Sequence, residues 1–112
     1  EMSLGRLFGK KETIEDGVKL CRSLPGAVLI DVRTHEEYVR VHIPGSRNFP
    51  LDGLQEMRLD KKTPVFVYCQ SGARSRMACL ALKQAGYEVT DIGGISGYKG
   101  ELETGDRGGE KE

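Results

Sequence analysis

Two short, unbroken apolar runs constrain the fold of this chain more than any other feature. Val28–Ile30 is followed at once by Asp31, and Val65–Tyr68 is preceded by Pro64. Continuous apolar runs of this length are typical of parallel strands that are buried on both faces. Segments with helical spacing alternate with these runs. The sequence therefore predicts an α/β domain, with a central, mainly parallel sheet and helices on both faces.

Capping signals and the spacing of apolar residues locate the helices. Thr13 with Asp16, and Thr34 with Glu37, have the three-residue spacing of a capping box. Apolar residues recur at helical spacing in three segments, and Gly86 ends the last of them, whereas the helix that starts at Thr34 is predicted from its capping pair alone. The helices are therefore expected at 13–24, 34–40, 51–57 and 75–85, and further strands at 47–49 and 87–92.

Length and charge bound the domain organisation and exclude some classes of function. The chain has 112 residues, with 17 basic and 17 acidic side chains. This length fits one domain. The balanced charge lacks the excess of basic residues that proteins use to bind nucleic acids or membrane surfaces. No apolar run is long enough for a membrane-spanning helix. We predict a polar lead-in over 1–12, one domain over 13–102 and a flexible tail rich in glycine and charge over 103–112, with no nucleic-acid or membrane partner.

The three cysteines have different expected roles. Their odd number and their spacing match no disulfide or metal framework, so we predict reduced thiols in a cytoplasmic protein and no metal site. Cys21 shares a predicted helix face with apolar residues and is expected in the core. Cys79 is interpreted as a small packed residue, with a redox role toward Cys69 as the alternative.

Cys69 lies where a parallel sheet binds its ligands, directly after a buried strand and before a helix. Gly72 allows the loop to curl so that backbone N–H groups point inward, and the following helix adds its positive N-terminal end. Arg74 adds a permanent cation. Such surroundings favour the thiolate and can lower a cysteine pKa from ~8.5 to roughly 3.5–7.5.

The charges around this loop support the same prediction. No acidic residue lies between Asp60 and Glu88. The basic residues of that segment are Lys61, Lys62, Arg74, Arg76 and Lys83. A chain with no net charge therefore places a positive patch around its cysteine.

Taken together, these motifs resemble the rhodanese family, the thiosulfate sulfurtransferases and their relatives. The pattern Cys69-x-x-Gly72-x-Arg74-Ser75 is similar to the active-site loop of that family. Three further stretches match in the same order along the chain. They are Leu29-Ile30-Asp31-Val32-Arg33 with Glu37-Tyr38, then His42-Ile43-Pro44-Gly45-Ser46 with Asn48 and Pro50, and finally Asp91-Ile92-Gly93-Gly94.

This resemblance implies a rhodanese-like domain and a two-step reaction. The Cys69 thiolate would take the outer sulfur of thiosulfate or a similar anionic donor, hold it as a persulfide and pass it to cyanide or a thiol, including a protein thiol. No metal or organic cofactor is required. The implied substrate-binding residues are Gln70, Ser71, Gly72, Ala73, Arg74 and Ser75.

Two other functions are alternatives to sulfur transfer for a loop of this kind. A related fold carries phosphatase or arsenate reductase chemistry with five residues between its cysteine and arginine. Here only four residues separate Cys69 from Arg74, and a shorter loop makes a tighter cradle that suits a single sulfur better than a phosphate. A non-catalytic interaction module of the same fold is the second rival, but such a module can dispense with the cysteine.

Two other groups of polar residues have structural interpretations. His42 precedes a turn and is expected to brace it by hydrogen bonds. Asp31 and Arg33 lie at the end of the first strand, and we expect Arg33 to form an ion pair with an acid such as Glu37.

Overall fold

The computed structural model of the protein describes residues 12–106 and contains a four-stranded sheet. The strands are β1 (Val28–Asp31), β2 (Arg47–Asn48), β3 (Pro64–Cys69) and β4 (Glu88–Gly94). Their order is β2-β1-β3-β4, and each neighbouring pair is parallel. The α/β class and the parallel sheet predicted from the apolar runs are confirmed. The longest run forms β3, which has a partner strand on each side.

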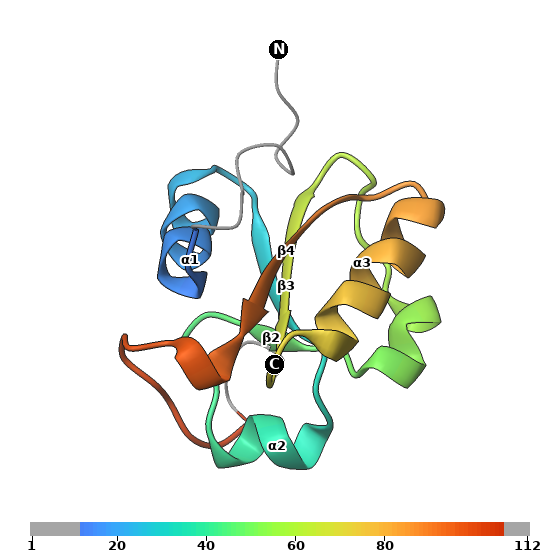
Figure 1. Ribbon diagram of the computed structural model, residues 1–112. Coiled ribbons are helices and arrows are strands. Elements are labelled where there is room, and N and C mark those ends of the chain that lie inside the picture. The colour runs from blue at the N-terminus through green and yellow to red at the C-terminus, as the bar shows by residue number, and fades with distance from the viewer. Residues whose placement is uncertain (1–11, 107–112) are drawn as a thin grey trace.

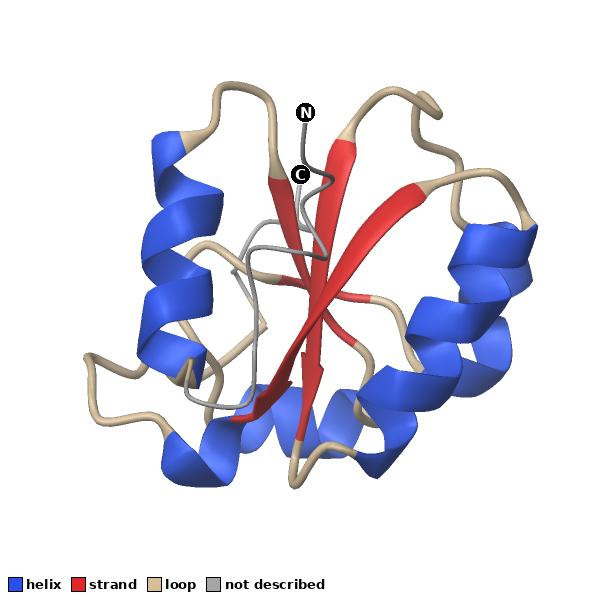
Figure 2. Cartoon of the chain, turned by 45° about the horizontal axis from the view of Figure 1, so that its top comes forward, coloured by secondary structure: helices blue, strands red, loops and turns tan. Residues whose placement is uncertain are grey.

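Helices cover both faces of this sheet (Figure 1, Figure 2). α1 (Ile14–Ser23) lies on one face, and α3 (Ala73–Gln84) lies on the other beside the 3-10 helix η2 (Leu51–Glu56). α2 (His35–Arg40) and the short 3-10 turn η3 (Ile95–Gly97) lie near the carboxyl ends of the strands. In the described part of the chain, no helix combines the length and the apolar character needed to cross a bilayer.

The alternation of side chains along β3 creates two separate cores. Phe66 and Tyr68 face α1, whereas Val65, Val67 and Cys69 face α3. All five side chains are buried. Because successive residues of a strand point to opposite faces, this register directs the Cys69 side chain toward the start of α3.

Both predicted capping boxes form. The hydroxyl of Thr13 accepts a hydrogen bond from the N–H of Asp16, whose carboxylate accepts the N–H of Thr13. Thr34 and Glu37 make the same reciprocal pair at the start of α2, at 3.2 and 2.9 Å. These bonds satisfy backbone donors that a helix start otherwise leaves unpaired.

The chain after residue 102 differs from the expected flexible tail. Glu103 forms an antiparallel bridge with His42, with backbone hydrogen bonds of 2.8 and 2.9 Å. The N–H of Gly105 also donates to the carbonyl of Val39 at 2.7 Å. Residues 103–106 therefore lie against the domain. The rest of the predicted tail, 107–112, and residues 1–11 of the predicted lead-in lie outside the described residues.

Candidate active site

The loop after β3 places Cys69 beneath the start of α3. The Cys69 side chain is buried, with 1% of its surface exposed. Gly72, the N-cap of α3, has φ of 110°, a left-handed conformation that other residues rarely adopt. This turn aims the N–H of Gly72 at the sulfur of Cys69, at 3.0 Å.

Opposing effects act on the ionisation of the Cys69 thiol. Burial, the largest effect, raises its pKa because it disfavours the charged thiolate. The hydroxyl of Ser75 and the backbone N–H groups of Ser75, Gly72 and Arg74 act in the opposite direction. These hydrogen bonds outweigh burial, so the pKa of Cys69 lies below its ordinary value. The loop therefore favours the nucleophilic form of the cysteine.

The hydroxyl of Ser75 has one proton and more than one acceptor. It lies 2.7 Å from Oδ1 of Asp91, and Ser75 itself is completely buried. The same carboxylate oxygen accepts the N–H of Gly93 at 3.0 Å, which holds it in place. The carbonyl oxygen of Gly72 lies 3.2 Å from the same hydroxyl. Because the hydroxyl can donate only once, Asp91, the Gly72 carbonyl and the Cys69 thiolate compete for its proton.

Glu37 holds the other end of the loop through Arg74. The guanidinium donates to both carboxylate oxygens, at 2.7 and 3.0 Å, in the bidentate geometry of strong charge-assisted pairs. The hydrogen bond from Arg74 is the largest effect on Glu37, and together with the capping contacts to Thr34 it outweighs burial, which acts in the opposite direction, and lowers the pKa of Glu37 to about 2. The positive charge predicted beside Cys69 is thus shared with a carboxylate that sequence reasoning had not assigned to it.

The expected pair between Arg33 and Glu37 is wrong. Arg33 instead binds Asp31, and both side chains are almost completely buried. Arg33 is two residues after Asp31 and reaches its carboxylate directly, whereas the carboxylate of Glu37 is turned toward Arg74. Arg33 also donates to the side-chain oxygen of Gln70, at 3.1 Å. The buried pair therefore contacts the cysteine loop from β1.

The third contact of the loop is with the end of β4. A Cβ on Gly94 would lie 2.7 Å from the Cα of Ser71 and closer still to the carbonyl oxygen of Gln70. That carbonyl also accepts the N–H of Ser96 at 3.1 Å. Gly94 thus lets β4 approach the loop backbone at a distance that a side chain would prevent.

Residues 69–75 form one continuous loop and helix start beside the sulfur, and α3 begins at Ala73, two residues before the predicted start at Ser75. Gln70, Ser71 and Ala73 are exposed at its rim. Arg74 borders a cleft of about 210 Å³, whose other lining residues are Val32, Thr34, Pro50, Leu51 and Asp52. Sequence reasoning did not assign Asp52 or Asp91 to the site, although Asp91 belongs to a motif that it had noted.

The other candidate residues lie away from this chemistry. Burial raises the pKa of Cys21 to about 11 and also raises the pKa of Cys79, which faces the carbonyl of Val89. His42 is fully buried and stacks on the ring of Tyr38, and its ring nitrogens contact the Tyr38 carbonyl and Glu103. The His42 side chain therefore joins α2 to Glu103, a structural role, although these hydrogen bonds go to those segments and not to the turn that it precedes.

Comparison with known proteins establishes the family. The sequence model of the rhodanese-like domain matches residues 14–101. The chain belongs to the rhodanese-like domain family. A solved structure described as rhodanese with anions from Escherichia coli superposes with a TM-score of 0.65 at 33% sequence identity, and the match covers 70% of this chain and 99% of that one.

Several curated relatives carry sulfurtransferase names, and two of them illustrate the match. The adenylyltransferase and sulfurtransferase uba4 of Ogataea parapolymorpha is 41% identical over 80 residues, which are 67% of this chain and 21% of the relative. The thiosulfate sulfurtransferase PspE of Escherichia coli is 38% identical over 71 residues, which are 59% of this chain and 68% of the relative. The chain thus spans about a fifth of the first relative and about two thirds of the second.

The contact between Gly94 and the loop predicts a specific effect of adding a methyl group. Gly94→Ala should displace the Gln70–Ser71 backbone, weaken the hydrogen bonds to the sulfur and raise the pKa of Cys69. Stability should fall by about 1–3 kcal/mol, the usual cost of overpacking. Gly97→Ala is the matched control, because a Cβ there meets no atom within 4 Å. Urea unfolding and the pH dependence of iodoacetamide alkylation measure the two effects. Equal behaviour of the two variants would contradict the close approach.

Competition for the Ser75 proton predicts opposite effects of two substitutions. Ser75→Ala removes a donor to the thiolate and should raise the pKa of Cys69. Asp91→Asn leaves a weaker, neutral acceptor, so the Ser75 hydroxyl donates more to sulfur and the pKa of Cys69 should fall. Alkylation rates measured from pH 4 to 10 report both values. A shift in the same direction in both variants would show that the two residues only support the loop.

The ion pair between Glu37 and Arg74 predicts a pH-dependent contribution to stability. An unfolded Glu has a pKa of ~4.3, whereas that of Glu37 is about 2 in the folded protein. The pair therefore stabilises the fold above about pH 4.3, and this contribution is lost as pH falls toward 2. Glu37→Gln should cost about 1–2 kcal/mol at pH 7, since a charge-assisted bond is lost at a partly exposed site. Urea unfolding from pH 7 to 2.5 should show the gap between variant and wild type narrowing, and a constant gap would contradict the assignment.

Proposed function

We propose that this protein is a sulfurtransferase in which Cys69 carries a sulfane sulfur from thiosulfate, or a similar anionic donor, to cyanide or a thiol. The observation that carries the proposal is a buried thiol with a depressed pKa beneath a ring of backbone donors. Membership of the rhodanese-like family and the relative named thiosulfate sulfurtransferase support it.

The first step forms a persulfide. The Cys69 thiolate attacks the outer sulfur of thiosulfate, an S–S bond to Cys69 forms, and the bond within thiosulfate breaks. Sulfite leaves with the electron pair of that bond. The N–H groups of Gly72, Arg74 and Ser75 already stabilise negative charge on Cys69, and they would stabilise the persulfide in the same way.

The second step returns the cysteine to its starting state. Cyanide or an acceptor thiolate attacks the outer sulfur of the persulfide, and the Cys69 thiolate leaves. Thiocyanate or an acceptor persulfide is the product. Neither step consumes or produces a net electron, so the cycle needs no redox cofactor.

Neighbouring carboxylates reduce the positive charge that Arg74 offers to an anionic sulfur donor. Two of its N–H groups are committed to Glu37, and the cleft that it borders also contains the carboxylate of Asp52. Arg74 therefore offers only part of its charge to an anionic donor beside Cys69. The convergent backbone donors, together with the rim residues Gln70, Ser71 and Ala73, supply the rest of the proposed binding site.

Sulfur loading tests the proposal most simply. One equivalent of sulfur, about 32 Da, should be added to the protein by thiosulfate and removed again by cyanide. Cys69→Ser should abolish the adduct because it removes the nucleophile, whereas Cys21→Ser and Cys79→Ser should retain it. Intact-mass spectrometry follows all four proteins. Sulfur retained by Cys69→Ser would show that another residue is the nucleophile, and a wild-type protein that stays unmodified would refute the function.

A further inference from the structure

The outward face of α3 carries an unusual apolar ridge. Met77 and Leu80 are three residues apart, so they lie on the same side of the helix, and their exposed fractions are 57% and 60%. Only Leu102 among the other large apolar side chains of residues 12–106 is comparably exposed. Two of the three exposed large apolar side chains therefore lie on the helix that begins at the cysteine loop.

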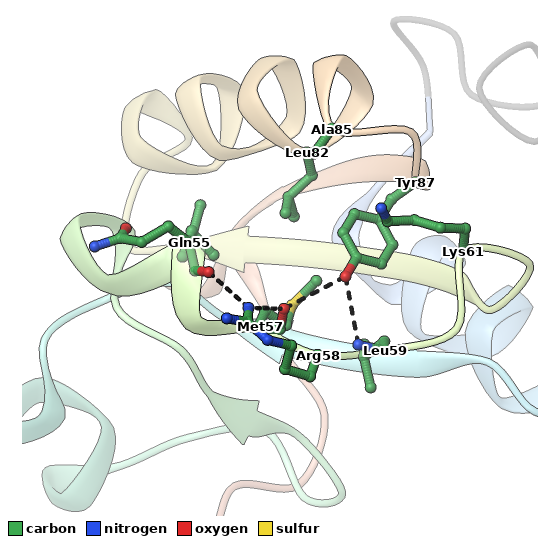
Figure 3. A pocket seen from close by; sticks show the side chains of 9 residues that line it. Gln55, Met57, Arg58, Leu59, Lys61, Leu82, Ala85 and Tyr87 are labelled. Atoms are coloured by element: carbon green, nitrogen blue, oxygen red, sulfur yellow. Dashed lines mark hydrogen bonds between the residues drawn. The ribbon is translucent and has the colours of Figure 1, made fainter.

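A hollow lies at the C-terminal end of α3, between that helix and the segment that contains η2 (Figure 3). Met77, Ala81 and Ala85 are exposed and four residues apart, so they connect the ridge to this hollow along one side of α3. It has a volume of about 640 Å³, and Leu82 and Ala85 of α3 form one wall. The opposite wall comes from η2 and the connection that follows it, including Leu54 and Met57. The hollow offers apolar surface next to the ridge that no described segment of the chain covers.

Cations frame the ridge and the hollow. Arg76 and Lys83 are seven residues apart on α3, so they line the same flank of the ridge. At the hollow, the Lys61 ammonium lies 4.8 Å from the centre of the Tyr87 ring, and Arg58 donates to the backbone carbonyls of Gln55 and Met57. None of these four cations forms an ion pair with a carboxylate in the part of the chain described by the structure.

The cations are spread over both flanks and do not converge on one point. This arrangement suits an extended acidic surface better than a single small anion. An apolar centre within a charged rim is the usual anatomy of a protein–protein interface. Because an α-helix rises ~1.5 Å per residue, Met77 and Leu80 lie about 6 and 11 Å along the axis from the first residue of α3. A partner on this face therefore lies beside the cysteine loop.

We propose that the ridge of Met77 and Leu80, the adjoining hollow and the flanking cations form a docking surface for an acidic protein that accepts sulfur from Cys69. The partner presents apolar side chains to the ridge and hollow and carboxylates to Arg76, Lys83, Arg58 and Lys61. Its reactive thiol lies at the edge of this contact, next to the loop. This inference rests on the proposed sulfur transfer and specifies the acceptor.

Two synthetic peptides with one thiol each provide the test. Both have the same length and the same leucine positions, and they differ only in carrying glutamates or lysines elsewhere. The rate constant for discharge of the Cys69 persulfide is measured with each peptide and with cyanide, at 0.15 M salt. The wild-type protein should transfer sulfur to the acidic peptide at least tenfold faster than to the basic one.

Charge reversal beside the ridge distinguishes an effect of this surface on peptide preference from an effect of the protein's net charge. Arg76→Glu combined with Lys83→Glu should invert the ratio of the rate constants for the two peptides, a ratio from which any general effect on the reactivity of the persulfide cancels. Met77→Ser combined with Leu80→Ser should slow the acidic peptide at least fivefold without affecting discharge by cyanide. The control is Lys19→Glu combined with Arg47→Glu, which makes the same change in net charge on exposed positions elsewhere. The control should retain the wild-type preference.

The outcomes separate this inference from the function on which it depends. Normal discharge by cyanide with no preference between the peptides would overturn the docking surface and leave the sulfurtransferase function intact. Inversion of the preference by the control pair would also overturn it, because the effect would then reflect net charge alone. Failure to form the persulfide at all would refute the proposed function, and the docking surface with it.

Discussion

The hydrogen bonds that reach the sulfur of Cys69 are the interaction on which the rest of the site depends. A buried thiol resists ionisation, since removal from water disfavours the thiolate. Backbone donors of the loop reverse this effect only while they converge on one atom. The positive φ of Gly72 provides that geometry locally. The remaining features of the site keep the loop in this conformation.

Three parts of the fold hold the loop, and each does so by different physical means. α2 contributes a charge-assisted bidentate pair from Glu37 to Arg74. The segment after β1 contributes a buried arginine, Arg33, that contacts Gln70, and β4 contributes the close approach of Gly94. The carboxylate of Asp91 then limits how much of the Ser75 proton reaches the sulfur. Reactivity at Cys69 is thus a balance between donors that favour the thiolate and a carboxylate that withdraws one of them.

Local sequence signals predicted the elements and the position of the cysteine, but not the pairing of distant side chains. Apolar runs and capping spacings involve neighbours within one or two turns, and these predictions of strands and helix starts were confirmed. The partner of Arg74 is 37 residues away, and several acids could have been chosen on charge alone. Glu37 was expected to bind Arg33, because the sequence does not reveal which face of α2 meets the loop. The same limit hid the bridge between Glu103 and His42, since a polar segment gives no sign that its backbone will pair.

The central claim is that the loop donors hold the pKa of Cys69 below its ordinary value although the residue is buried. The most direct measurement is the pH titration of thiolate absorbance at 240 nm in the variant that combines Cys21→Ser and Cys79→Ser, which leaves Cys69 as the remaining thiol. The account predicts a single ionisation below ~8.5, the ordinary cysteine pKa, and its loss when Cys69 is also replaced by serine. A midpoint at or above ~8.5 would mean that burial prevails over the loop donors, and the account of this site as a nucleophilic sulfur carrier would be wrong.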